Sequence, residues 1–208
     1  MKQSFFFLFL VLAMAGTAYA APQAAPQAAP MIGAAAPAFS GTTSDGDAIS
    51  LADFAGKKVV LEWTNHDCPF VRKHYDSGNM QRTQRALTED GAVWITIISS
   101  APGKQGHVSG DVANDLNQRR GAYVDHVILD PEGTIGRAYE AKTTPHMFII
   151  DEAQVLQYMG AIDSIRSARQ SDIPKATNYV LAAYDALKSG GEVAETSTRA
   201  YGCTVKYK

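Results

Sequence analysis

The chain has few of the features that identify many protein classes. Its 208 residues include only two cysteines, so a scaffold of several disulfides is excluded. Nineteen basic residues nearly balance twenty-one acidic ones, and no block of like charges stands out. This balance argues against nucleic acid or an anionic membrane surface as the main partner. Beyond the N-terminal segment no apolar run is long enough to span a membrane, and no phosphate-binding glycine pattern occurs.

The N-terminal segment has the pattern of an export signal. Lys2 precedes an apolar stretch over residues 5–15, and Ala18-Tyr19-Ala20 is a typical cleavage site. Because the apolar stretch is too short to span a bilayer comfortably, we expect residues 1–20 to be a cleaved signal peptide rather than an anchor. Residues 21–32 are rich in Ala, Pro and Gln and predict a linker. The expected location is therefore periplasmic or secreted.

The remaining sequence predicts one α/β domain over residues 33–188 and a C-terminal tail over residues 189–208. Apolar and turn patterns indicate strands at 39–43, 48–51, 58–64, 92–98, 127–129, 147–150 and 155–159. Helices are expected at 69–76, 79–87, 111–120, 136–140 and 174–188, with Val112 and Leu116 on one face of the third and Ala176, Val180, Ala183 and Leu187 on one face of the last. Alternating strands and helices predict a three-layer sandwich around a mixed sheet.

The stretch around Cys68 carries the chemistry. A buried strand ends near Thr64, polar residues form a turn, and Pro69 is suited to the first position of a helix. Cys68 should therefore lie at the helix N-cap, where free backbone N–H groups and the helix dipole stabilise a thiolate. Arg72 and Lys73 would add positive charge, whereas Asp67 would oppose it. We interpret Cys68 as a reactive thiol rather than an inert buried one.

The strand, cysteine and helix resemble the thioredoxin superfamily. The wider chain, from about Gly33 to Leu187, resembles its redoxin and peroxiredoxin-like branch, the alkyl hydroperoxide reductase/thiol-specific antioxidant (AhpC/TSA) type. A second anchor is Thr143-Thr144-Pro145-His146, which is similar to the cis-proline loop of that superfamily. The resemblance implies a thioredoxin fold and a cis Thr144–Pro145 bond. It also implies that Thr144 and Pro145 position the substrate beside Cys68.

Glu62 lies six residues before Cys68, where thioredoxins carry a buried acid. A carboxyl group in an apolar strand should have a raised pKa and could relay a proton in catalysis. An acid at an exposed strand edge is the equally weighted alternative.

The sequence departs from the resemblance at informative positions. The second cysteine of a Cys-x-x-Cys motif is Val71 here, and the peroxiredoxin proline and threonine are replaced by Leu61 and Asn65. Cys203 lies 135 residues after Cys68 in the glycine-containing tail. It is a candidate resolving cysteine that could fold back onto Cys68 or reach another subunit, with an idle tail cysteine as the alternative.

These observations predict an exported thiol oxidoreductase with an antioxidant or redox role. Cys68 is the nucleophile, Glu62 and Cys203 are its catalytic partners, and the substrate is a peroxide or a protein disulfide with a thiol as reductant. No cofactor is expected. His66, His74 and His146 are read as surface or loop residues rather than metal ligands. The alternatives are a non-catalytic thioredoxin-like binding protein and a copper or other metal chaperone.

Overall fold

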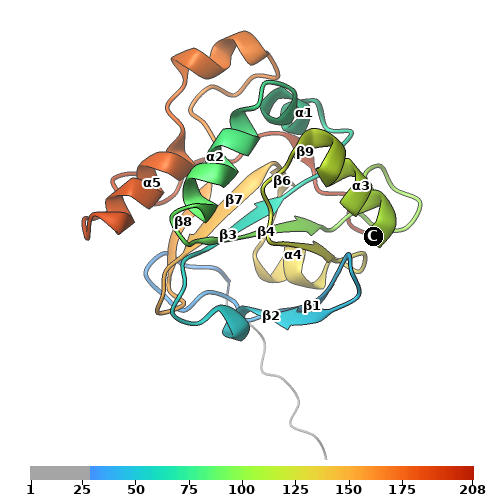
Figure 1. Ribbon diagram of the computed structural model, residues 1–208, viewed down its shortest axis with the longest axis horizontal. Helices are drawn as coiled ribbons and strands as arrows, with labels where there is room; N and C mark the ends of the chain where they lie inside the picture. The colour runs from blue at the N-terminus through green and yellow to red at the C-terminus, as the bar shows by residue number, and fades with distance from the viewer. Residues whose placement is uncertain (1–28) are drawn as a thin grey trace, which may run out of the picture.

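The computed structural model describes residues 29–208, which form a mixed sheet with helices on both faces (Figure 1). The seven strands of this sheet are β1 (Ser40–Thr43), β2 (Ala48–Ser50), β3 (Val59–Trp63), β4 (Val93–Ile98), β5 (His126–Leu129), β7 (His146–Ile150) and β8 (Leu156–Gly160), in the order β2-β1-β5-β4-β3-β7-β8. The helices are α1 (Pro69–Asp76), α2 (Asn79–Thr88), α3 (Gly110–Arg120), α4 (Thr134–Ala138) and α5 (Tyr179–Lys188). A second, two-stranded sheet joins β6 (Thr143–Thr144) to β9 (Cys203–Thr204).

The centre of the sheet contains both parallel and antiparallel strand pairs. β3 runs parallel to β4 and β4 parallel to β5, whereas β3 runs antiparallel to β7. Helices α1 and α2 connect β3 to β4, and α3 connects β4 to β5, because parallel neighbours need a crossover. The three-layer α/β architecture with a central mixed sheet is confirmed.

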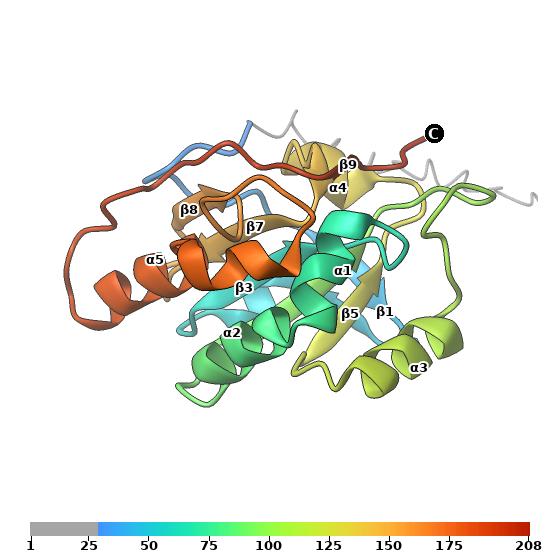
Figure 2. The ribbon, with the colours of Figure 1, turned by 90° about the horizontal axis from the view of Figure 1, so that it is seen from above.

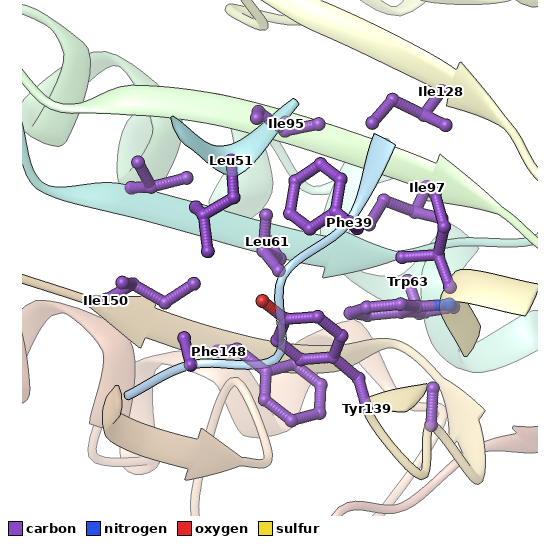
Figure 3. Packing of buried hydrophobic residues seen from close by; sticks show 14 of the residues in the cluster. Phe39, Leu51, Leu61, Trp63, Ile95, Ile97, Ile128, Tyr139, Phe148 and Ile150 are labelled. Carbon is purple, nitrogen blue, oxygen red and sulfur yellow. The ribbon is translucent and has the colours of Figure 1, made fainter. Parts of the chain in front are cut away.

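Alternate residues of β3 face two different cores. Leu61 and Trp63 face the core that α4 covers, where Trp63 packs against Tyr139 and Phe148 with ring centroids 5.4 and 5.1 Å apart (Figure 3). Val60 faces the opposite core, which α1, α2 and α5 cover and which also contains Cys68. A strand covered on both faces reads as a nearly continuous apolar run, and β3 does so except at Glu62.

Three helices differ from the sequence prediction, and one of them, α4, spans Thr134–Ala138 rather than 136–140. In α3, Ala113 is buried whereas Val112 is 43% exposed, so the predicted apolar face is wrong. Gly110 sets the rotation of this helix, since a Cβ there would lie 2.1 Å from the backbone oxygen of Ser44. The last helix begins at Tyr179 rather than near Pro174, because the Asn178 side chain accepts a hydrogen bond from the Leu181 N–H at 3.0 Å and caps it.

The C-terminal tail packs along the domain rather than leaving it. In Figure 2 it runs from the end of α5 past β8 to β9 and the C-terminus. Met159 donates a backbone hydrogen bond to Thr196, and the Val205 N–H donates to Lys142 at 3.1 Å. Beyond β9, the Ala101 N–H donates to the Lys206 carbonyl at 2.9 Å. The tail is thus held by three separate parts of the domain.

The expected signal peptide and most of the expected linker lie outside the described residues. Within residues 29–208, none of the helices combines the length and apolar character that a membrane span requires.

Candidate active site

Cys68 occupies the N-cap of α1, as the sequence predicted. Its backbone N–H donates to the Asn65 carbonyl at 3.0 Å, its carbonyl accepts from the Arg72 N–H at 2.9 Å, and Pro69 is the first helical residue. The side chain is fully buried in the core beneath α1. The sulfur therefore lies at the positive end of a helix but away from bulk solvent.

The loop that contains Pro145 contacts the Cys68 sulfur directly. The Thr144–Pro145 peptide bond is cis, which confirms the expectation from the resemblance. The Cys68 thiol donates to the Thr144 carbonyl with 3.1 Å between sulfur and oxygen. Thr144 is buried and lies in β6, so this loop and the start of α1 form one site.

β9 brings Cys203 to the same place. Cys203 is paired with Thr144 in the antiparallel register of β6 and β9, and it is partly exposed. Its carbonyl accepts from Thr144 Oγ1 at 3.5 Å, and its side chain packs against the core that contains Cys68. Gly202 allows this approach, since its φ is +144° and a Cβ there would lie 2.0 Å from the Thr144 carbonyl oxygen. The two free thiols are therefore adjacent within one chain.

The two thiols ionise in a defined order. Burial raises the pKa of Cys68, but hydrogen bonds from Cys203, from the Val71 N–H and from Thr144 outweigh it and leave the pKa lowered. Burial and the neighbouring Cys68 sulfur raise the pKa of Cys203 to about 11. The first thiolate of the pair is therefore on Cys68, with Cys203 as a hydrogen-bond donor to it.

The charged residues near Cys68 have other partners. Lys73 is fully buried and its Nζ lies 2.8 Å from Asp163 Oδ2. Arg72 is exposed and lies 3.8 Å from Asp76, and the half-exposed Asp67 lies 3.5 Å from His66. The lowered pKa of Cys68 thus follows mainly from hydrogen bonds at the helix start and from β9, rather than from the basic residues that the sequence singled out.

Glu62 is fully buried beneath α1 and α2. Its carboxylate accepts hydrogen bonds from Tyr75 Oη at 3.0 Å, Trp94 Nε1 at 3.0 Å and Gln84 Nε2 at 3.2 Å. Burial is the largest effect and raises the pKa of Glu62, as the sequence predicted, although these donors partly oppose it. The exposed-edge alternative is therefore wrong. These three donors hold the carboxylate within the core.

We expect Glu62→Gln to change the pH dependence of stability. A raised folded-state pKa gives stability that is present below the unfolded value of 4.5 and is lost as pH rises through the folded value. Glutamine keeps the shape and an acceptor but does not ionise. The variant should gain stability relative to the wild type as pH rises, by up to about 1.4 kcal/mol per pH unit within that window.

Urea unfolding of both proteins at several pH values measures this difference. Glu152→Gln is the control, because its hydrogen bond with Lys58 lowers the pKa of Glu152 and gives the opposite sign. A free-energy difference between wild type and Glu62→Gln that does not vary with pH would contradict the prediction.

Two of the histidines interpreted as surface or loop residues, His74 and His146, are buried. His74 contacts Tyr201 and Asn79 inside the core, and His146 stacks on Phe148 with ring centroids 4.5 Å apart. Burial lowers the pKa of both His74 and His146 to about 4, so both rings are neutral near pH 7. In the described part of the chain, no group of three or more His, Cys, Asp or Glu side chains is placed to hold a metal ion.

A buried polar network next to the cysteines was not predicted. The Tyr201 hydroxyl donates to Asp163, and it accepts from Lys73 Nζ at 3.2 Å. His74 Nε2 lies 3.3 Å from the same hydroxyl. Lysine and aspartate are mostly surface residues, so their sequence positions gave no signal of this network. The glycine beside Cys203 was the one local indication that the tail approaches another backbone closely.

A mixed α/β sandwich with a thiol at a helix N-terminus and a cis-proline loop beside it is typical of the thioredoxin superfamily, which the sequence resembles. The model of the AhpC/TSA family matches residues 32–159, and the chain belongs to this family. The resemblance seen in the sequence is thus confirmed. No curated protein matches the chain in sequence.

Solved structures share this fold. A hypothetical protein from Sinorhizobium meliloti 1021 is 21% identical with a TM-score of 0.71, and the match covers 86% of this chain and 95% of that protein. An uncharacterized conserved protein from Geobacillus kaustophilus is 24% identical with a TM-score of 0.71, covering 86% and 93%. At this level of identity the likeness concerns the fold.

Proposed function

We propose that the protein is an exported thiol oxidoreductase whose redox centre is the Cys68–Cys203 pair. The observation that carries this proposal is the pairing of Cys203 with Thr144, whose carbonyl oxygen accepts the Cys68 thiol at 3.1 Å. An oxidising compartment such as the periplasm, which the N-terminal pattern favours, would let the disulfide between them persist. Thr144 and Pro145 position the substrate beside Cys68, and Glu62 relays a proton.

A peroxide is the substrate that this arrangement favours. The Cys68 thiolate attacks one peroxide oxygen and the O–O bond breaks, which leaves Cys68 as a sulfenic acid. The alkoxide or hydroxide that departs takes a proton from solvent and becomes an alcohol or water. The Cys203 thiol then attacks the Cys68 sulfur, which forms the disulfide and releases water. Two equivalents of an external thiol reduce this disulfide and return both thiols.

The position of β9 favours a peroxide over a protein disulfide as the substrate. β9 already pairs with the backbone of Thr143 and Thr144, and Cys68 is fully buried behind it. An extended polypeptide would have to displace the tail to reach Cys68, whereas a small oxidant needs only a local opening. The same occupied edge disfavours a binding protein that holds a peptide at this loop.

Reaction of the reduced protein with hydrogen peroxide, followed by intact mass, tests the proposal. We expect the wild type to lose two hydrogens and Cys203→Ser to accumulate a sulfenic acid at Cys68 that dimedone traps. Cys68→Ser should react far more slowly, because burial still raises the pKa of Cys203 after the Cys68 sulfur is removed.

Two outcomes would count against the proposal at different levels. If the wild type stays reduced in excess peroxide, peroxide is not the substrate, and oxidised glutathione becomes the next oxidant to test. If neither oxidant produces a disulfide between Cys68 and Cys203, the pair is not a redox centre.

A further inference from the structure

A buried polar cluster connects the two ends of the cysteine pair. α1 carries Cys68 at its N-cap and Lys73 in its second turn, while Tyr201 precedes Cys203 by two residues in the tail. Lys73 and Tyr201 meet at Asp163, which lies in the segment after β8. One short helix and one buried cluster therefore link the sulfur of Cys68 to the backbone that holds Cys203.

The Tyr201 hydroxyl has a complete set of partners in this cluster. It donates to Asp163 and accepts from Lys73 Nζ at 3.2 Å, and His74 Nε2 lies 3.3 Å away. Asn79 Nδ2 lies 2.9 Å from His74 Nδ1, which leaves Nε2 as the nitrogen that carries the proton toward Tyr201. The Tyr201 ring also packs edge-on against Phe70, with centroids 5.7 Å apart.

The choice of residues is costly for stability alone. Burying an ammonium and a carboxylate loses hydration that their attraction only partly returns, and an apolar cluster of the same volume would stabilise the fold as well or better. The polar cluster instead fixes the position of the tail, because the tyrosine hydroxyl satisfies all its partners in only one position along the tail. A shift of the tail by one residue would leave Asp163 and Lys73 without this hydroxyl.

We propose that Tyr201 is a positioning residue for the redox pair, locked by Lys73, Asp163 and His74 so that Cys203 stays in register with Thr144 and against Cys68. This inference rests on the proposed function of the Cys68–Cys203 pair. It assigns the task of the buried cluster, which is to raise the effective concentration of the Cys203 thiol at Cys68. Tyr201 itself does not contact the Cys68 sulfur.

The equilibrium with glutathione tests this proposal. Oxidised glutathione accepts two electrons from the two thiols, giving the internal disulfide and two molecules of reduced glutathione, and the ratio of species gives the effective concentration. We expect Tyr201→Phe to lower the equilibrium constant with glutathione by roughly ten-fold or more, because the hydrogen bonds of the Tyr201 hydroxyl to charged partners are lost. The pKa of Cys68, followed by thiolate absorbance, should rise as the contact from Cys203 loosens.

Tyr184→Phe is the matched control. Its hydroxyl donates to Asp90 at 3.0 Å in another part of the core, so the variant loses a tyrosine–aspartate hydrogen bond away from the cysteines. It should lose stability but keep the wild-type glutathione constant. Phe70→Leu keeps the test available if Tyr201→Phe does not fold, and it should lower the constant by roughly two- to ten-fold through the lost ring contact.

The outcomes separate this proposal from the one it rests on. If the wild type forms no internal disulfide with glutathione, the redox pair itself fails. If the wild type forms it and Tyr201→Phe and Phe70→Leu both keep the wild-type constant, the redox pair stands and Tyr201 is only a structural residue.

Discussion

Replacing Gly202 by alanine should expose Cys68. A Cβ at this position would lie 2.0 Å from the Thr144 carbonyl oxygen and 2.7 Å from its carbon, and both are backbone atoms that cannot turn aside. The φ of +144° at Gly202 also disfavours any residue with a side chain. β9 must therefore separate from β6, and the fully buried Cys68 loses its cover.

Alkylation by iodoacetamide, mapped by peptide mass, measures this exposure. We expect the rate at Cys68 to rise at least about ten-fold, which corresponds to an opening free energy lower by about 1.4 kcal/mol. Formation of the disulfide with Cys203 should slow in the same variant. Gly191→Ala is the control in the preceding segment, since a Cβ there meets its nearest atom at an ordinary 3.5 Å. Equal rates at Cys68 in the wild type and Gly202→Ala would refute the docking of β9 on this site.

Replacing Asp163 by asparagine should produce a large loss of stability. Lys73 is fully buried and its ammonium lies 2.8 Å from Asp163, the carboxylate that compensates it. Asparagine leaves the ammonium without this charge, and breaking a buried ion pair in this way costs about 3–5 kcal/mol. The cost arises from the unpaired buried ammonium, so adding Lys73→Met to Asp163→Asn should recover much of the lost stability.

Urea unfolding monitored by tryptophan fluorescence measures both effects, since Trp63 and Trp94 are fully buried. Asp115→Asn is the control, because its pair with Arg119 lies on the surface of α3 and exposed pairs contribute little. A loss for Asp163→Asn no larger than that of the control would mean that water or another group compensates Lys73.

Local sequence patterns predicted the part of the site that one short segment builds. An apolar strand, a polar turn and a proline at the start of a helix place Cys68 at the N-cap whatever surrounds it. The apolar neighbours of Glu62 left burial and an exposed strand edge as equal alternatives, and the structure decided for burial. The cis bond before Pro145 followed from the resemblance to the thioredoxin superfamily rather than from these patterns.

Sequence patterns gave wrong predictions where contacts with another segment decide which face of a helix is buried. Val112 and Leu116 have helical spacing, yet the contact of Gly110 with Ser44 turns α3 so that Ala113 is buried instead. The helical pattern before Tyr179 was extended too far, although Asn178 is a good N-cap residue and could have marked the start.

The sequence alone determined the fold class and the place of Cys68, because these depend on strand and helix periods and on a turn of a few residues, and the family followed from the resemblance. Only the tertiary structure decided that Cys203 meets Cys68, since 135 residues separate them and the tail carries no period. It also decided that Lys73 pairs with Asp163 and Tyr201 rather than with the Cys68 thiolate. A charge has no preferred partner in sequence, and its partner is set by which groups the packed elements bury together.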